Sequence, residues 1–571
     1  MNKIKQVLGR MTIGLLCGGL LCGTAFGAGI APVPGSALPD AWGRAGSKVT
    51  LSVQEVEGRP VTISGAIAPS AGKLVTVTIP IRTPPGRLRV QFVNDGTDKT
   101  ITTRDIEVLA PELPGDPQAR RVQLLINPRL TPPQVDALLA RLLPGVGTLN
   151  SRETLPAPAA PRPNTRAAGT SPCGGTLAEI QLGAGITLEA ALNLLAQEGG
   201  EDVWYPDPIS NWNGHALAQS LPNQTQSAQP QLNPQSFNYA PAPVVPRVVL
   251  GSPTGGRTGA GVTIAVLDTG FSTTLDPTRE LNTPQGMRLP RVSPPINALV
   301  PYDPANPAPS LTGAQDFWEG HGTQVAMLAA GTQSGVAPGA SVLPIKVCAP
   351  GAGGRASCST KDVLRGLCVA LSKVPAQQLV LNLSLGGATP TGGIHAVLNW
   401  AQLNGAVVVA AGGNQHLNHP TTPNAPDPEE YPAAFARSHA PSQAALPILA
   451  VASVTPPTWN ARSLNVSALW PLSGFSTRGS YLNISAPGDS LDLGHIQLYS
   501  GTSFAAPLVA GAAALARQAN PGMTAVALRT YMLSGGRIIA GGGNVAAQNT
   551  SAGIVQTASV QNLPMLKLNG Y

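Results

Sequence analysis

Two patterns of apolar and polar residues divide this chain. Between residues 47 and 110, apolar and polar side chains alternate along five short runs, which Gly, Pro and an Asn-Asp-Gly turn interrupt. Alternation with a period of two is typical of strands that bury one face, and such turn residues separate strands. The first pattern therefore predicts a small antiparallel β domain within residues 28–110, most simply an Ig-like sandwich.

The second pattern begins near residue 245. Six near-continuous apolar runs follow one another with helical stretches between them: "GVTIAVLD", "SVLPIKV", "QLVLNLSL", "GAVVVAAGG", "PILAVASV" and "YLNISAPG". Strands that are buried on both faces have such runs, and helical crossovers make neighbouring strands parallel. We expect an α/β fold here, with a doubly wound, mostly parallel sheet, and ligands bind such sheets at the carboxyl ends of the strands.

Between these parts, residues 118–209 predict a small α+β unit. The order is strand, helix and strand, and the same order then repeats. Thr131 is the expected N-cap of the first helix, with proline in its first turn. The Pro/Ala-rich insert 156–172 separates the two halves and is predicted to be disordered. Residues 210–246 are rich in Gln, Asn, Pro and Ser, which is typical of a linker.

The N-terminus has the features of a secretory signal peptide. Lys3 and Lys5 precede a short apolar core, and small residues follow at Ala25 and Gly27. We expect cleavage after residue 27 and a secreted protein, with the cell surface or periplasm as alternatives. Cys22 leaves a lipoprotein as a further alternative, although it is not preceded by a small residue. No later apolar run approaches about 20 residues, so no stable membrane anchor is expected.

Composition agrees with secretion. The 571 residues suit several domains, and they are 43% apolar and only 11% charged, with 64 Gly and 57 Pro. The net charge of +7 is spread thinly and forms no basic run, so nucleic-acid binding is not expected.

Four cysteines remain after the signal peptide, and secretion permits disulfides. Cys348 and Cys358 flank a flexible Gly-rich loop and are the preferred pair. Four cysteines allow three connectivities, so the pairing stays open. Cys368 lies in a helical pattern, where we expect a buried thiol.

Three residues whose side chains could take part in catalysis follow strand ends or begin helices: Asp268 in "VLDTG", His321 in "HGTQVA" and Ser503 in "GTSFAAP". Each has a structural alternative, since Asp-Thr-Gly is an ordinary turn and His or Ser can cap a helix. Together they supply a nucleophile, a base and a carboxylate that orients the base, which is the set that amide hydrolysis through an acyl-serine requires.

These motifs resemble those of the subtilisin-like serine proteases, the subtilases. The order Asp, His, Ser is that of the family, and "SGVAPGASVLPIKV", "VLNLSLGG", "VVVAAGGN", "YPAAF" and "FSTRGSYLNISAPG" stand where members have similar text. The resemblance covers a catalytic domain at residues 247–562, followed by a tail, 563–571. It implies a serine endopeptidase with a triad of Asp268, His321 and Ser503 and with Asn414 as an oxyanion-hole donor beside the Ser503 N–H. A departure from the family is Phe504, where Met is usual.

The same resemblance implies a substrate cleft. Two segments would pair as strands with a bound peptide: one contains Ser384, Leu385 and Gly386, the other Gly412 and Gly413. Glu430 stands near the floor of the primary specificity pocket, where a carboxylate would favour basic residues in the substrate. The alternative is a solvated acidic loop.

The resemblance also implies that the 118–209 unit is an inhibitory propeptide whose last strand leads into the active site. The protein would then be a self-processing zymogen, with its maturation site in the linker, and an unrelated accessory domain is the alternative. Catalysis would need no cofactor, whereas structural calcium is possible by resemblance, with Asp303, Asp316 and Asp427 in plausible loops. His416 and His419 have a spacing that could suit a metal, without an accompanying carboxylate or thiol motif.

Polypeptide substrates and the chain's own propeptide are the expected partners of what we expect to be a monomer. Two rival functions remain. A serine-carboxyl peptidase of the sedolisin type shares the fold but has no catalytic histidine, which His321 disfavours. A secreted binding protein on a subtilase scaffold would not need an intact triad.

Overall fold

The computed structural model describes the following residues: 39–56, 59–61, 72–79, 81, 86–93, 101–109, 120–160, 169–214, 217–218, 250, 254–276, 278–303, 312–317, 320–351, 356–416, 427–437, 445–455, 470–493, 498–534, 538–544 and 563–566. The predicted signal peptide, most of the linker and the second histidine of the proposed pair, His419, lie outside these residues.

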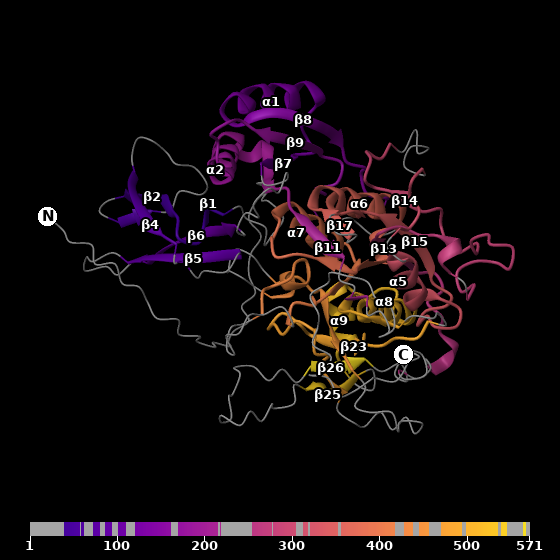
Figure 1. The fold of residues 1–571 in the computed structure, drawn as a ribbon. Coiled ribbons are helices and arrows are strands. Elements are labelled where there is room, and N and C mark those ends of the chain that lie inside the picture. Colours follow the sequence, from indigo (N-terminus) through magenta and orange to yellow (C-terminus); the bar gives the residue numbers. More distant parts are fainter. Residues whose placement is uncertain are drawn as a thin grey trace, which may run out of the picture.

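A sheet of ten described strands forms the centre of the larger part (Figure 1). Its seven leading strands run parallel, and all six predicted apolar runs lie among them. The order across the sheet is β14 (Ile296–Asn297), β15 (Ser341–Lys346), β13 (Thr263–Asp268), β18 (Leu379–Leu383), β20 (Val407–Ala411), β21 (Leu449–Val454), β23 (Ile484–Pro487), β26 (Leu563–Leu566), β25 (Ile538–Asn544) and β22 (Trp470–Pro471). The predicted doubly wound, mostly parallel sheet is confirmed.

Helices cover both faces of this sheet. On one face α5 (His321–Ala330) and α8 (Thr502–Ala519) pack together, and α9 (Ala525–Met532) lies against α8. On the other face α6 (Thr360–Lys373) packs beside α7 (Gly392–Leu403). The strands are buried on both sides because of this double cover, which explains their apolar sequences. Short 3-10 turns occur at Gly200–Asp202, Thr254–Gly256, Thr273–Leu275, Ala376–Gln378 and Ala433–Ala436.

Residues 121–208 fold as a four-stranded antiparallel sheet with two helices. Their order along the chain is β7 (Arg121–Ile126), α1 (Pro132–Val146), β8 (Gly147–Thr154), β9 (Thr176–Leu182), α2 (Leu188–Gly199) and β10 (Val203–Pro208). The strands are ordered β10-β7-β9-β8, so the two predicted halves interleave in one sheet. Thr131 precedes α1 as predicted, and its N–H is 2.8 Å from Gln134 Oε1. Below, this part is called the α+β unit.

The α+β unit lies against α6 and α7, on the face of the sheet that those helices cover (Figure 1). Leu125, Leu177 and Tyr205 of the unit belong to the same apolar core as the large sheet. Gly392 begins α7 beneath Tyr205, and a Cβ on this glycine would stand 2.5 Å from the tyrosine ring. The unit is therefore packed on the part that contains the large sheet, rather than joined to it only by the chain.

The residues before the α+β unit form two three-stranded sheets, ordered β1-β6-β5 and β3-β2-β4. Their strands are β1 (Ala41–Arg44), β2 (Lys48–Val56), β3 (Arg59–Val61), β4 (Gly72–Thr78), β5 (Gly86–Val93) and β6 (Ile101–Leu109). Val49 and Leu51 of one sheet share a core with Ile106 and Val108 of the other. The pairing of β1 with β6 is parallel, which the alternating pattern did not indicate.

The prediction of disorder is wrong for the described ends of the insert, residues 156–160 and 169–172, and the prediction of a buried thiol at Cys368 is wrong. The described ends of the Pro/Ala-rich insert are packed, since the Ala159 N–H donates to the Leu371 carbonyl (2.8 Å) and the Trp400 indole donates to the Gly169 carbonyl (3.3 Å). Cys368 is not a thiol but forms a disulfide with Cys173. The sequence pattern missed both because these contacts join segments about 200 residues apart.

Candidate active site

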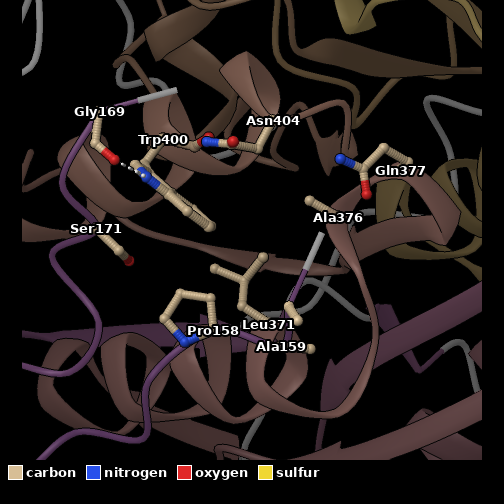
Figure 2. A pocket seen from close by; sticks show the side chains of 10 residues that line it. Pro158, Ala159, Gly169, Ser171, Leu371, Ala376, Gln377, Trp400 and Asn404 are labelled. Atoms are coloured by element: carbon tan, nitrogen blue, oxygen red, sulfur yellow. Dashed lines mark hydrogen bonds between the residues drawn. The ribbon is translucent and has the colours of Figure 1, made fainter. Parts of the chain in front are cut away.

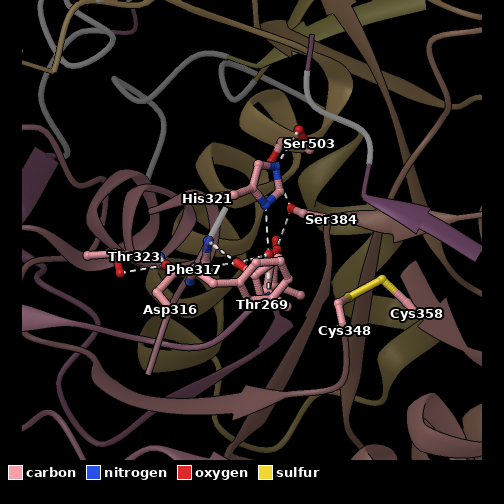
Figure 3. A network of polar contacts seen from close by, with 12 residues as sticks. Thr269, Asp316, Phe317, His321, Thr323, Cys348, Cys358, Ser384 and Ser503 are labelled. Atoms are coloured by element: carbon pink, nitrogen blue, oxygen red, sulfur yellow. Dashed lines mark hydrogen bonds and ion pairs between the residues drawn. A yellow bond between two sulfur atoms is a disulfide. The ribbon is translucent and has the colours of Figure 1, made fainter. Parts of the chain in front are cut away.

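Asp268 and His321 meet at the carboxyl end of β13. Asp268 is the last residue of that strand, and His321 is the first residue of α5. His321 Nδ1 lies 2.7 Å from Asp268 Oδ1, and both side chains are almost fully buried (Figure 3). A parallel sheet places functional residues at this edge, as the sequence analysis expected.

Ser503 reaches the same point from the first turn of α8. Its Oγ lies 3.0 Å from His321 Nε2 (Figure 3), whereas Asp268 contacts the other ring nitrogen, Nδ1. The carboxylate, the imidazole and the hydroxyl therefore form one hydrogen-bonded series. In such a series the imidazole can accept the serine proton while the carboxylate holds the ring.

Asp316 fastens the elements that carry this series. Its carboxylate accepts hydrogen bonds from the hydroxyls of Thr269 (2.6 Å) and Thr323 (2.7 Å), and from the N–H groups of Thr323 (2.8 Å) and Phe317 (2.9 Å). Burial raises the pKa of Asp316, against the effect of these donors. Because Thr269 follows Asp268 and Thr323 lies near the start of α5, Asp316 fixes the end of β13 relative to the start of α5.

Phe504 packs against the catalytic imidazole. Its ring centroid is 5.1 Å from that of His321 and 5.5 Å from that of Tyr499. The departure from the family noted in the sequence therefore places an aromatic ring beside the proposed base.

Asn414 lies beside the start of α8. Its Oδ1 accepts hydrogen bonds from the N–H and the hydroxyl of Thr502, both at 2.9 Å. These two bonds fix the side-chain amide, with its oxygen toward Thr502 and its NH₂ group on the other branch. The orientation suits a donor next to Ser503.

A segment of the chain itself occupies the edge where a substrate would bind. β11 (Asn211–Gly214) runs antiparallel between β17 (Ala356–Ser359) and β19 (Leu385–Gly386), and β16 (Ala349–Pro350) completes this small sheet. After a two-residue step, β12 (Leu217–Ala218) pairs with β24 (Tyr499–Ser500), just before Ser503. The strand pairing expected for Leu385 and Gly386 is thus present, with the chain's own segment as the partner.

Ser384 has another contact. Its hydroxyl donates to the Ser503 carbonyl at 2.7 Å, so this side chain holds the start of α8 against the end of β18. Sequence reasoning expected Ser384 to contact the substrate and missed this bond.

The expected strand pairing of Gly412 and Gly413 with a peptide is wrong. The Gly412 N–H donates to Val451 O (2.8 Å), and its carbonyl accepts from the Tyr481 hydroxyl (2.8 Å). The Gly413 N–H and carbonyl are taken by the Thr502 hydroxyl and the Thr477 N–H. Both glycines therefore connect β20 to Asn414, and because their N–H groups already have acceptors, they have no donor left for a ladder with a peptide.

Glu430 is buried, with 2% of its surface exposed, which contradicts the alternative of a solvated loop. A Cβ on Gly413 would stand 3.1 Å from the Glu430 side chain, so this carboxylate lies next to the residue before Asn414. Its neighbour Glu429 accepts from the Tyr431 hydroxyl (2.9 Å) and pairs with Arg437.

The preferred pair, Cys348 and Cys358, forms a disulfide (Figure 3). The Cys348 N–H donates to the Asp268 carbonyl at 3.3 Å, and Cys358 lies opposite Trp212 in the β17–β11 ladder. The disulfide thus ties the cleft strand β17 to the end of the strand that carries Asp268.

Asp316 and Asp427, two of the suggested calcium ligands, accept hydrogen bonds from the protein itself. The Asp316 carboxylate is taken by the four donors given above, and Asp427 accepts from His416 Nδ1 (3.0 Å) and from the Arg478 N–H (2.7 Å). Asp303 is exposed. Within the described part of the chain, no group of three or more His, Cys, Asp or Glu side chains could hold a metal ion.

A cavity of about 250 Å³ lies between the insert and the ends of α6 and α7, and none of the triad residues lines it (Figure 2). Pro158, Gly169, Leu371 and Trp400 are among the residues that line it. It belongs to the contact between the α+β unit and the catalytic part.

Among the described helices, none has the length and apolar character needed to cross a membrane.

Comparison with known proteins gives one consistent family. The sequence model of the subtilase family matches residues 259–553. Subtilisin BL of Lederbergia lenta is 32% identical over 286 residues, which cover 48% of this chain and 84% of that protein. Subtilisin E of Bacillus subtilis is 30% identical over 288 residues, with 49% and 61% covered.

Solved structures are similar at lower levels. Fervidolysin from Fervidobacterium pennivorans shares 18% identity over 80% of this chain and 61% of that chain, with a TM-score of 0.48. A cold-adapted subtilisin-like serine proteinase shares 26% identity over 55% of this chain and 91% of that chain, with a TM-score of 0.36. Since both scores are below 0.5, the sequence matches carry the assignment.

Proposed function

The chain belongs to the subtilase family and is a serine-type endopeptidase, and on that premise we propose that Ser503, His321 and Asp268 cleave its polypeptide substrates. The single observation that supports this most is the continuous hydrogen-bonded series from Asp268 Oδ1 through the His321 ring to Ser503 Oγ. Asp268 and His321 are 53 residues apart in the chain and His321 and Ser503 are 182 apart, and no local structural role requires them to meet.

In the proposed mechanism the Ser503 oxygen attacks the carbonyl carbon of the substrate while His321 Nε2 takes the hydroxyl proton. Asp268 holds the ring in the tautomer that leaves Nε2 able to accept, and it stabilises the imidazolium that forms. The negative charge that develops on the carbonyl oxygen is met by the Ser503 N–H and by the Asn414 amide.

His321 then gives its proton to the leaving amine, and the C–N bond breaks to leave an acyl-serine. Water enters, His321 takes its proton, and the ester is hydrolysed to regenerate Ser503. A histidine in hydrogen-bond contact with the nucleophile disfavours the serine-carboxyl alternative, and a complete triad disfavours a binding protein without activity.

We further propose that the protein is a secreted zymogen, with residues 1–27 as its signal peptide, and works as a monomer. Residues 28–110 form an N-terminal β domain, 118–209 an inhibitory domain, 210–246 a linker, 247–562 the catalytic domain and 563–571 a tail. The position of β11 supports inhibition, because this strand follows the α+β unit directly and occupies the ladder between β17 and β19 that a substrate needs.

The same strands indicate where the zymogen cuts itself. β11 and β12 pair with cleft strands on either side of Ser503, and only two residues separate them. The cut therefore falls on one of the three peptide bonds between Gly214 and Leu217. His215 and Ala216 themselves lie outside the described residues, so we propose these three bonds together as the maturation site.

N-terminal sequencing of the purified protein tests this proposal. The wild type is expected to yield a new N-terminus at residue 215, 216 or 217, whereas Ser503→Ala stays uncut apart from loss of the signal peptide. Identical N-termini in the two proteins would show that another protease does the trimming.

Glu430 supports a preference for basic residues on the acyl side of the cut. Its buried carboxylate lies beside Gly413, next to the proposed oxyanion donor. An arginine or lysine side chain that reached it would form a charge-assisted pair. Peptides with Arg or Lys before the cut are expected to be cleaved faster than Leu or Phe peptides, with the preference lost in Glu430→Gln; equal rates in the wild type would exclude this role.

A further inference from the structure

We propose that self-cleavage does not release the inhibitory α+β unit, because the Cys173–Cys368 disulfide keeps it covalently bound to the catalytic domain. The mature enzyme is then a two-chain molecule held by a disulfide. This inference rests on the proposed function, which supplies the cut, but its own basis is a different observation.

The disulfide joins the two sides of any cut in the linker. Cys173 directly precedes β9 of the α+β unit, and Cys368 lies in α6 of the catalytic part, 195 residues further along the chain. A cut between Gly214 and Leu217 falls inside the loop that this disulfide closes. Hydrolysis of one peptide bond within a closed loop opens the loop and leaves both pieces joined.

Contacts around the disulfide make it part of a built interface. Arg365, one turn before Cys368, donates to both carboxylate oxygens of Glu153 from its Nε atom (2.9 and 2.8 Å). The insert that precedes Cys173 is held at Leu371 and Trp400, at the ends of α6 and α7 (Figure 2). The tether therefore lies within the contact between the α+β unit and helices α6 and α7.

The tether has a consequence for inhibition. Linking two partners makes their rebinding intramolecular, with an effective concentration on the order of millimolar for a short connection. The α+β unit would return to its site after each dissociation, whatever the enzyme concentration. Dilution therefore cannot relieve inhibition while the disulfide is intact.

The disulfide is protected from reductants in the folded protein. Cys173 is 2% exposed and Cys368 is 0% exposed. Thiol–disulfide exchange requires access of a thiolate to one of the two sulfurs. Mild reduction of the folded enzyme is expected to leave the tether intact, so that removal of the α+β unit requires further proteolysis.

Gel electrophoresis of the self-processed protein tests the tether. The expected result is one band of full size without reductant, and two bands after denaturation with a dithiol, which converts the disulfide to two thiols. The Cys173→Ala/Cys368→Ala variant should give two bands in both lanes. Cys348→Ala/Cys358→Ala is the matched control, because both of its cysteines lie on the same side of the cut and the tether should persist.

A free N-terminal fragment in the non-reducing lane of the wild type would overturn the inference. One band in every lane would mean instead that self-processing failed. That case is resolved with a Ser503→Ala chain that carries a site for a sequence-specific protease inserted between residues 225 and 240. After cleavage there, fragments that separate without reductant contradict the tether, and fragments that stay together support it.

Activity on dilution tests the consequence. The specific activity of the processed wild type is expected to be the same before and after a 1,000-fold dilution, whereas that of Cys173→Ala/Cys368→Ala should rise. Equal behaviour of the two proteins would show that the tether does not maintain inhibition.

Discussion

His321 Nε2 lies 3.0 Å from the Ser503 hydroxyl, although α5 and α8 begin 181 residues apart in the chain. Two helices that pack side by side on one face of a parallel sheet bring these residues together. Asp268 completes the contact from the strand beneath. The chemistry of the site therefore depends on how the sheet and these two helices are stacked.

Asp268→Asn tests the role of the carboxylate. The substitution keeps the size of the side chain but disfavours the histidine tautomer that accepts the serine proton, so we expect kcat to fall on the order of 10⁴-fold with little change in KM. Steady-state kinetics on a peptide substrate measure this. In Asp276→Asn, which alters a buried carboxylate that binds the N–H groups of Glu280 and Leu281, stability should fall but kcat should not.

Asn414→Ala tests the oxyanion donor. The expected loss is on the order of 10²–10³-fold in kcat, the size established for this kind of donor in a subtilisin. Asn414→Asp keeps an oxygen for Thr502 but removes the NH₂ group, so it should lose at least as much. Near-normal turnover by the Asp variant would mean that the amide only holds Thr502.

The ion pair between Glu153 and Arg365 predicts the strength of the interface. Their side chains are 10% and 3% exposed, and Arg365 also pairs with Asp362 (2.7 Å), which remains when Glu153 is replaced. In the uncut Ser503→Ala chain, Glu153→Gln is therefore expected to lower the free energy of unfolding by more than about 1 kcal/mol but by less than the about 3 kcal/mol that a fully orphaned buried charge would cost. Chemical denaturation measures this.

The matched control is Asp136→Asn, which removes an exposed pair with Arg152 within the α+β unit. Its cost should stay below about 1 kcal/mol. Equal costs for the two substitutions would argue that the interface pair is not buried in solution.

Asp207 predicts how stability depends on pH. Burial, with a smaller contribution from the nearby Glu107, raises its pKa from 3.8 to about 6, against the N–H groups of Gly393 and Gly392 that donate to its carboxylate. The folded state thus holds this proton more tightly than the unfolded state. The stabilising contribution is full below about pH 4 and is lost as the pH rises through about 6.

Asparagine stays neutral at every pH. The free energy of unfolding of Asp207→Asn should therefore rise relative to that of the parent as the pH increases from 4 to 7.5. Denaturation of the Ser503→Ala chain with and without this substitution, at both pH values, gives the difference. A difference that does not vary with pH would show that Asp207 has an ordinary pKa.

Short segments of the sequence were enough to predict the sheet and the triad. Strands buried on both faces must be apolar throughout, and residues such as Asp268 stand out where those runs end. Ser503 and His321 were recognisable because their motifs resemble those of a known family. In each case a segment of fewer than about ten residues carried the information.

Contacts between distant segments could not be predicted in this way. The partner of Cys368 was not recognisable because Cys173 lies in a Pro/Ala-rich stretch with no periodic pattern. The sequence did not show that Asp316 binds Thr269 and Thr323, because an aspartate in a loop sequence can bind either hydroxyl groups or a cation. Gly412 and Gly413 appeared suited to a peptide ladder until their backbone partners, Val451 and Thr477, were known.

Covalent labelling of the processed Cys173→Ala/Cys368→Ala enzyme, in which no tether maintains inhibition, with a fluorophosphonate, followed by peptide mass spectrometry, tests the central claim most directly. The account predicts a single label on Ser503, together with loss of peptidase activity. A fully folded, processed enzyme that cleaves peptides without label on Ser503, or with the label on another serine, would contradict it.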